Sequence, residues 1–166
     1  MVRASPDNTN RNTNMKSKLI LTALALTAAT ATARELAIHE CPQPVRSTIE
    51  SNARGGMIEE VDWVAINGKE IYVAEVDLPR DTDLKIYVAA DGQLIKIRED
   101  LAFAEAPPEV RNTLTGFGGR VDDLDHETEG TKVTYYAEIE RSGQSDLKLT
   151  LDASGRVTQQ YEDHDD

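Results

Sequence analysis

The sequence predicts an α+β fold of two tandem repeats, each a helix followed by a four-stranded antiparallel sheet, with the helices packed on one sheet face. Two observations predict this fold. Residues 69–77, "KEIYVAEVD", and residues 132–140, "KVTYYAEIE", are closely similar and lie 63 positions apart. The same offset aligns most of the chain after residue 41 with itself. A fixed internal period is typical of a duplicated supersecondary unit.

Each copy is expected to begin with a short amphipathic helix. In the first copy, Val45, Ile49 and Ala53 follow Pro44 at spacings that place them on one helix face, and the glycine pair 55–56 follows. Proline in the first turn and glycine after the last turn are typical of helix ends. The second copy repeats the pattern with Pro108, Val110, Leu114 and Phe117, and Gly116 is expected to shorten or fray this helix.

Four strands are expected after each helix. The first strand covers residues 57–66 in one copy and 120–128 in the other, and the dipeptide Asn67-Gly68 is a two-residue hairpin signal. In the next two strands, apolar residues alternate with polar ones, which defines the face that should contact the helix. These apolar residues are Tyr72, Ala74, Val76, Leu84, Ile86 and Val88, and then Tyr135, Ala137, Ile139, Leu147, Leu149 and Leu151.

The predicted domain boundaries follow from the repeat. Residues 1–33 are expected to be a signal peptide, residues 41–100 the first repeat, residues 101–107 a linker and residues 108–163 the second repeat. A unit of about 60 residues buries only about 60% of its unfolded surface. The copies are therefore expected to associate, either side by side in one curved sheet with both helices on the same face, or through packed faces.

The N-terminal segment has the pattern of an export signal. Lys16 and Lys18 precede an apolar run over residues 19–29, and small residues at 31–33 form a cleavage site before Arg34. The apolar run is shorter than the roughly 20 residues of a membrane-spanning helix, so no stable membrane span is expected after cleavage. The predicted location is periplasmic or secreted. A retained anchor is the alternative, and the true start, Met1 or Met15, stays open.

The charge balance excludes one class of partner. The chain has 18 basic and 30 acidic residues and a net charge of −12. Loss of residues 1–33 removes four basic residues and one acidic residue, which leaves about −15. Phosphate binding needs clustered Lys and Arg, so nucleic acid is not expected as a partner.

A recurring motif gives a family resemblance. "PVRSTI...GG.I..V", "G...Y.AE" and "L.I...DG.L" recur as "EVRNTL...GG.V..L", "Y.AE" and "L.L...SG.V" between about residues 41 and 161. With these motifs the chain resembles the PepSY-like family, whose domain is described as beta-lactamase-inhibitor-like. The resemblance implies two tandem copies of the domain and an exported binding or inhibitory protein without established catalysis.

No catalytic residues, cofactor-binding residues or metal ligands are predicted, and the chain is not expected to be an enzyme or to hold a cofactor. Cys41 and the serines lie in no nucleophile-elbow or Cys/His sequence context, and the histidines are scattered at His39, His126 and His164. Cys41 has no internal disulfide partner, so its role stays open. Carboxylates in "DDLDHETE", residues 122–129, and in the C-terminal tail could hold calcium weakly. A solvated strand face and a terminal tail are the simpler interpretations.

The surface with the strongest docking pattern is the outward sheet face of the first repeat. Ile71, Val73, Tyr87, Ile95 and Ile97 share the parity opposite to the expected core residues. This face is either covered by the chain itself or docks another protein.

The sequence therefore predicts an exported non-enzymatic binding module, an inhibitor or regulator of an envelope or secreted protein. Its partner would be an unidentified protein or peptide. The alternative is an acidic cation-binding envelope protein. The candidate partner-binding residues are Trp63, Ile71, Val73, Tyr87 and Tyr136, chosen because aromatic anchors contribute much of the binding energy of interfaces.

Overall fold

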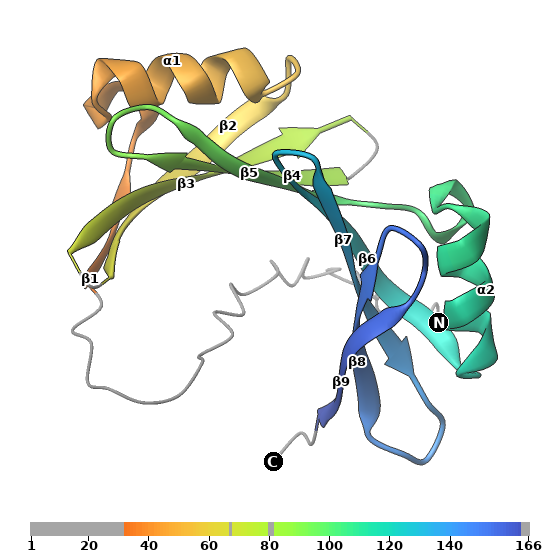
Figure 1. Ribbon diagram of the computed structural model, residues 1–166. Coiled ribbons are helices and arrows are strands. Elements are labelled where there is room, and N and C mark those ends of the chain that lie inside the picture. The colour runs from red at the N-terminus through yellow and green to blue at the C-terminus, as the bar shows by residue number, and fades with distance from the viewer. Residues whose placement is uncertain (1–31, 67, 80–81, 164–166) are drawn as a thin grey trace, which may run out of the picture.

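The protein is described by a computed structural model that covers residues 32–66, 68–79 and 82–163 (Figure 1). Its strands form a single nine-stranded sheet in which each strand pairs antiparallel with the next strand along the chain. The elements in chain order are β1 (Thr32–Leu36), η1 (Ile38–Glu40), α1 (Gln43–Asn52), β2 (Met57–Ile66), β3 (Lys69–Leu78), β4 (Thr82–Ala89), β5 (Leu94–Asp100), η2 (Phe103–Glu105), α2 (Pro108–Gly116), β6 (Arg120–Glu129), β7 (Lys132–Glu140), β8 (Asp146–Asp152) and β9 (Val157–Asp163).

The single sheet shows that the predicted fold class, two repeats each with its own four-stranded sheet, is wrong. β5 pairs with β6 from Ile97↔Thr128 to Asp100↔Asp125, and β1 adds a ninth strand beside β2. The physical reason is that separate sheets would expose the N–H and C=O groups of two further strand edges. Pairing β5 with β6 satisfies these groups.

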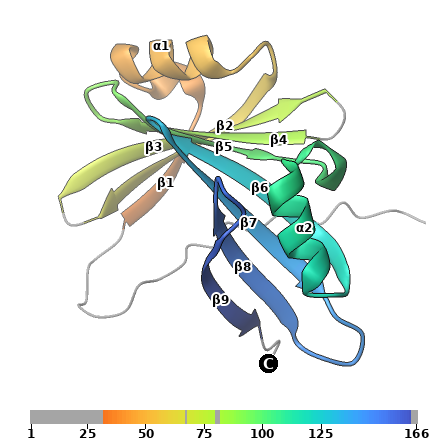
Figure 2. The ribbon, with the colours of Figure 1, turned by 45° about the vertical axis from the view of Figure 1, so that its right-hand side comes forward.

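Both helices cover the same face of the sheet. The register places Leu84, Glu99 and His126 opposite one another across β4, β5 and β6, so these three side chains share one face. Leu84 belongs to the core under α1, and Leu124, two residues before His126, belongs to the core under α2. Figures 1 and 2 show that the sheet bends strongly and carries both helices on its outer side. We call this side the convex face and the opposite side the concave face.

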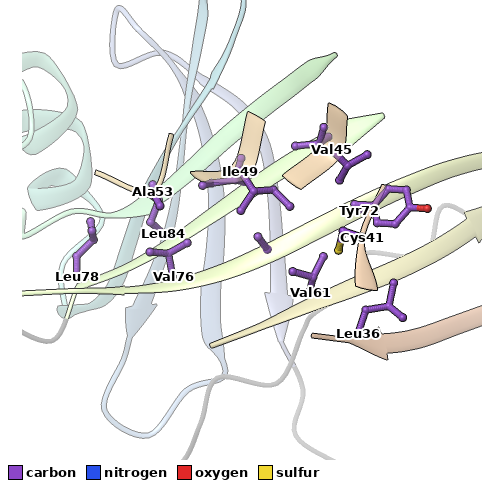
Figure 3. Packing of buried hydrophobic residues seen from close by; sticks show 13 residues of the cluster. Leu36, Cys41, Val45, Ile49, Ala53, Val61, Tyr72, Val76, Leu78 and Leu84 are labelled. Carbon is purple, nitrogen blue, oxygen red and sulfur yellow. The ribbon is translucent and has the colours of Figure 1, made fainter. Parts of the chain in front are cut away.

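The buried apolar residues form two clusters, one under each helix. In the first, Val45 and Ile49 of α1 are fully buried and pack on strands β2 to β4 (Figure 3). In the second, Val110 and Leu114 of α2 pack on β6 to β8 in the same way. Full burial of an aliphatic side chain stabilises the folded state by about 1.5–3 kcal/mol, so the two clusters attach the helices firmly to the sheet.

Each helix is also bound to a hairpin of the sheet. The Thr48 hydroxyl donates a hydrogen bond to the Gly92 carbonyl at 2.6 Å, and Thr113 does the same to Gly155 at 2.8 Å. Both glycines have positive φ, and a Cβ at Gly155 would lie 2.6 Å from a helix carbonyl oxygen. Only glycine fits this close approach.

The expected signal peptide, residues 1–33, lies outside the described residues except for Thr32 and Ala33, which begin β1. Asn67 and His164 also lie outside them. Within the described ranges, the structure contains no helix with the length and apolar composition needed to cross a membrane.

Candidate functional site on the concave sheet face

The structure divides the predicted partner-binding residues between the two faces. Val73 and Tyr87 are register partners on the concave face, and Ile71 has the same parity. Tyr136, from the second half of the chain, is also on the concave face, opposite Asp125. Trp63 instead packs against the first core cluster on the convex face, so the sheet separates it from the other four residues.

The predicted outward apolar set is wrong at one residue, Ile97, which lies on the opposite face. It pairs with Ile86 and packs against the first core cluster on the convex face. A register shift between Tyr87 and Val88 moves the side chains of β5 to the face opposite to the one expected from β4. Counting alternate residues from the turn does not reveal such a shift. Val73 is on the concave face but is only 6% exposed. The apolar part of this face is therefore small.

Charged side chains occupy the middle of the concave face, where β5 pairs with β6. Lys96 contacts Glu127 at 2.8 Å, and Arg98 contacts Asp125 through two guanidinium nitrogens at 2.6 and 2.8 Å. Asp125 and Glu127 are 9% and 7% exposed. Because buried carboxylates need such partners, these two ion pairs allow the two halves of the sheet to join here.

Two tyrosines complete this seam network, which consists of Lys96, Arg98, Asp125, Glu127, Tyr87 and Tyr136. The Lys96 ammonium lies 4.5 Å from the centre of the Tyr87 ring, and the Arg98 guanidinium lies 4.1 Å from that of Tyr136. The Tyr136 hydroxyl donates a hydrogen bond to Glu127 at 3.2 Å. Burial, together with the charge of Glu127, raises the pKa of Tyr136 to about 12. Tyr136 therefore stays a neutral donor at physiological pH.

Asp100 and Asp125 face each other at the end of the seam. Burial and a side-chain hydrogen bond with Asp125 raise the pKa of Asp100 to about 6. Burial also raises the pKa of Asp125, although Arg98 opposes this shift. The pair therefore favours holding a proton below about pH 6.

A cleft of about 340 Å³ opens on the concave face beside the seam network and extends over the second half of the sheet. Register pairs place Asp123, Glu138, Lys148 and Tyr161 in one row across β6, β7, β8 and β9. All four line the cleft. Tyr161 is 45% exposed and forms the outer wall on the edge strand.

Sequence reasoning missed Lys96, Arg98 and Tyr161. A signal for the first two was present, because the cations at 96 and 98 and the carboxylates at 125 and 127 share a spacing of two residues. Such matched alternation favours cross-strand ion pairs. Tyr161 gave no signal of its own, since only the register of β9 brings it to the cleft.

The residues considered for catalysis or metal binding lie elsewhere or do not converge. His126 is on the convex face, its Nε2 lies 3.7 Å from Glu99, and its buried Nδ1 has no hydrogen-bond partner among the described residues. Cys41 is buried in the first core cluster, where burial raises the pKa of its thiol. In the part of the chain that the structure describes, no group of three or more His, Cys, Asp or Glu residues is arranged to hold a metal ion.

Comparisons with known proteins establish the fold. No model of a protein family matches the chain, and no curated protein matches it. Solved structures from Bacteroides are similar. A DUF2874 family protein from Bacteroides uniformis shares 18% identity at a TM-score of 0.60, covering 74% of this chain and 89% of that one. A BLIP-like protein from Bacteroides fragilis shares 13% identity at a TM-score of 0.57, covering 76% and 90%.

A third similar structure, of a Bacteroides eggerthii protein presumed to be periplasmic, shares 15% identity at a TM-score of 0.61 and covers 74% and 88% of the two chains. These likenesses support the BLIP-like fold that the sequence resemblance implied. They do not confirm the two tandem copies.

Proposed function

We propose that this protein is an exported, non-enzymatic binding module and that its concave sheet face binds another protein, which it inhibits or regulates. The observation that carries the proposal is the open cleft of about 340 Å³ on the face that neither helix covers. Protein interfaces combine aromatic side chains with charged groups at their edges. The cleft has this composition, with Tyr87, Tyr136 and Tyr161 among its charged residues.

The arrangement of the sheet supports the concave face over the convex face. On the convex face, the helices and the two core clusters bury the apolar side chains. On the concave face, the seam network holds Tyr87 and Tyr136 in place through Lys96 and Arg98. Side chains that are already fixed lose little conformational entropy on binding. A partner would therefore meet a preorganised surface.

The similar structures favour the same role and location. One is of a protein described as BLIP-like, and another is of a protein presumed to be periplasmic. An exported binding module agrees with both descriptions and with the signal pattern of the sequence. The partner would be a protein of the same compartment.

A pair of neighbouring glutamines tests the proposal. Gln159 pairs with Thr150 on the concave face, Gln160 pairs with Leu149 on the convex face, and both are exposed. Gln159→Arg places a long cation beside the cleft, and Gln160→Arg places the same cation on the other side. Each variant would be used to capture partners from periplasmic extract, with the unmodified protein as reference.

We expect Gln159→Arg to lose most of the partner that the unmodified protein captures, and Gln160→Arg to retain it. Equal capture by the two variants would contradict binding through the concave face. Circular dichroism and urea midpoints of both variants establish that neither result comes from unfolding. The acidic cation-binding alternative rests only on the acidic composition of the chain and on its carboxylate runs.

A further inference from the structure

The cations of the cleft are all engaged by carboxylates of this chain. Lys96 contacts Glu127, Arg98 contacts Asp125, and Lys148 contacts Asp163. An anionic ligand would have to compete with these internal carboxylates for every cation. The cleft is therefore poorly suited to a carboxylate or phosphate group.

Two carboxylates of the cleft, in contrast, are less closely paired with cations. Asp123 lines the cleft, is exposed, and makes no ion pair with any other described residue. Glu138, its register partner, reaches only Lys148, at 3.7 Å, and Lys148 is shared with Asp163. The two cations near these carboxylates, Arg98 and Lys148, are thus each already paired with another carboxylate, Asp125 and Asp163. An additional positive charge would be stabilised here.

The electrostatics of these two carboxyl groups agree with the geometry. Loss of hydration raises the pKa of Asp123, and the negative charge of Asp100 adds to the shift while Arg98 opposes it. Loss of hydration likewise raises the pKa of Glu138, and the charges of Asp146 and Asp123 add to it while Lys148 opposes it. Each group is held in its charged form less easily than in water. A cation placed between them would oppose both shifts.

The far wall of the cleft favours an organic cation. Tyr161 belongs to the same cross-strand row as Asp123 and Glu138, and 45% of it is exposed. Tyr87 and Tyr136 already carry Lys96 and Arg98 over their rings. Arginine and lysine combine a charged end with an apolar stem, which suits a carboxylate pair beside an aromatic wall.

We propose that the cleft binds an arginine or lysine side chain of the partner protein, with its charged group at Asp123 and Glu138 and its apolar stem toward Tyr161. This inference rests on the proposed function, because it names the chemistry of the partner at the same face. A basic side chain inserted here would be the anchor of the interface.

The test is an NMR titration of the isotope-labelled protein with N-acetylarginine amide. N-acetylcitrulline amide is the matched probe, because citrulline has nearly the same shape and no charge. We expect the arginine probe to shift the amide signals of Asp123, Glu138 and Tyr161, and the citrulline probe to leave them in place. Equal shifts with both probes, or no cleft shifts with either, would overturn the proposal.

Two asparagine variants give the test a matched control. Asp123→Asn removes the unpaired carboxylate, and we expect it to raise the Kd of the arginine probe about fivefold or more. Asp122→Asn removes the adjacent carboxylate, which contacts Arg120 at 2.6 Å and does not line the cleft, and we expect less than a twofold change. An equal effect of both variants overturns the assignment, because it would indicate only a general loss of negative charge.

The two proposals fail separately. If Gln159→Arg abolishes partner capture but the arginine probe does not bind the cleft, the concave face remains the binding surface and the basic anchor is wrong. If Gln159→Arg and Gln160→Arg capture equally, the proposed function fails whatever the titration gives.

Discussion

The stability of the sheet is expected to depend on pH through Asp100, which faces Asp125 where β5 pairs with β6. Burial and the hydrogen bond with Asp125 raise the pKa of Asp100 from 3.8 to about 6. A carboxyl group with a raised folded-state pKa contributes stability that is fully present below its unfolded pKa and is lost as pH rises through its folded pKa. The protein should therefore lose stability as pH rises from about 4 through 6.

The magnitude follows from the size of the shift. A folded-state pKa of about 6 against an unfolded value of 3.8 gives a change of about 1.4 kcal/mol in the free energy of unfolding between pH 5 and pH 7.5. Asp100 is only half-buried, so solvent screening reduces this to about 1 kcal/mol. With a urea dependence of about 2 kcal/mol/M, the urea midpoint should be about 0.5 M higher at pH 5.

The substitution Asp100→Asn isolates this effect, since asparagine stays neutral at every pH. We expect the variant to be more stable than the unmodified protein at both pH values, and its advantage to be about 1 kcal/mol larger at pH 7.5 than at pH 5, because its own stability lacks the contribution of Asp100 to the pH dependence. Glu105→Gln, at an exposed residue of η2, is the control for loss of one negative charge. If Asp100→Asn shows the same difference between pH 5 and pH 7.5 as the unmodified protein, the reasoning is refuted.

Three further substitutions are expected to change the urea midpoint. Gly155→Ala should lower the free energy of unfolding by about 2–3 kcal/mol, because the added Cβ would clash with the backbone at a residue of positive φ. Gly143→Ala, also at positive φ but with open space around it, should lower it by about 1 kcal/mol. Equal losses would contradict the close helix contact. Ile49→Ala should cost about 3–4 kcal/mol, since Ile49 is fully buried, and a loss below about 1 kcal/mol would contradict its core position. Arg98→Gln should cost about 2–3 kcal/mol by leaving the Asp125 carboxylate without its cation, and an unchanged midpoint would show that the pair does not hold the seam.

The order of elements could be predicted because it depends on local pattern. Val45 and Ile49 have helical spacing, and both are buried in α1 as that spacing requires. The alternation of Tyr72, Ala74 and Val76 likewise identified the face of β3 under the helix. A buried face requires apolar residues at a fixed spacing in the sequence, so the helix and the buried face of the strand could be predicted.

The pairing of β5 with β6 could not be predicted in this way. The residue pattern of a strand shows which of its faces is buried, but not which other strand hydrogen-bonds to its edge. β1 was missed for a related reason, because residues 32–36 overlap the predicted cleavage site and show no clear alternation.

The sheet face of the candidate partner-binding residues could be predicted in part. Parity alone placed Ile71, Val73 and Tyr87 together, and the structure agrees. Trp63 was chosen for its aromatic character, without an argument from parity, and it lies on the convex face. The cleft residues Asp123 and Tyr161 are brought together only by the register of four successive strands, which depends on bulges and turns that local patterns do not fix.

Photo-crosslinking in intact cells would test the central claim most directly. Benzoylphenylalanine placed at Tyr161, which lines the cleft, or at Gln160, its exposed neighbour on the convex face, reports which side of the sheet contacts the partner. Our account predicts one specific crosslinked species from position 161 and none from position 160. Crosslinking of the same species with equal yield from both positions, or from position 160 alone, would contradict it.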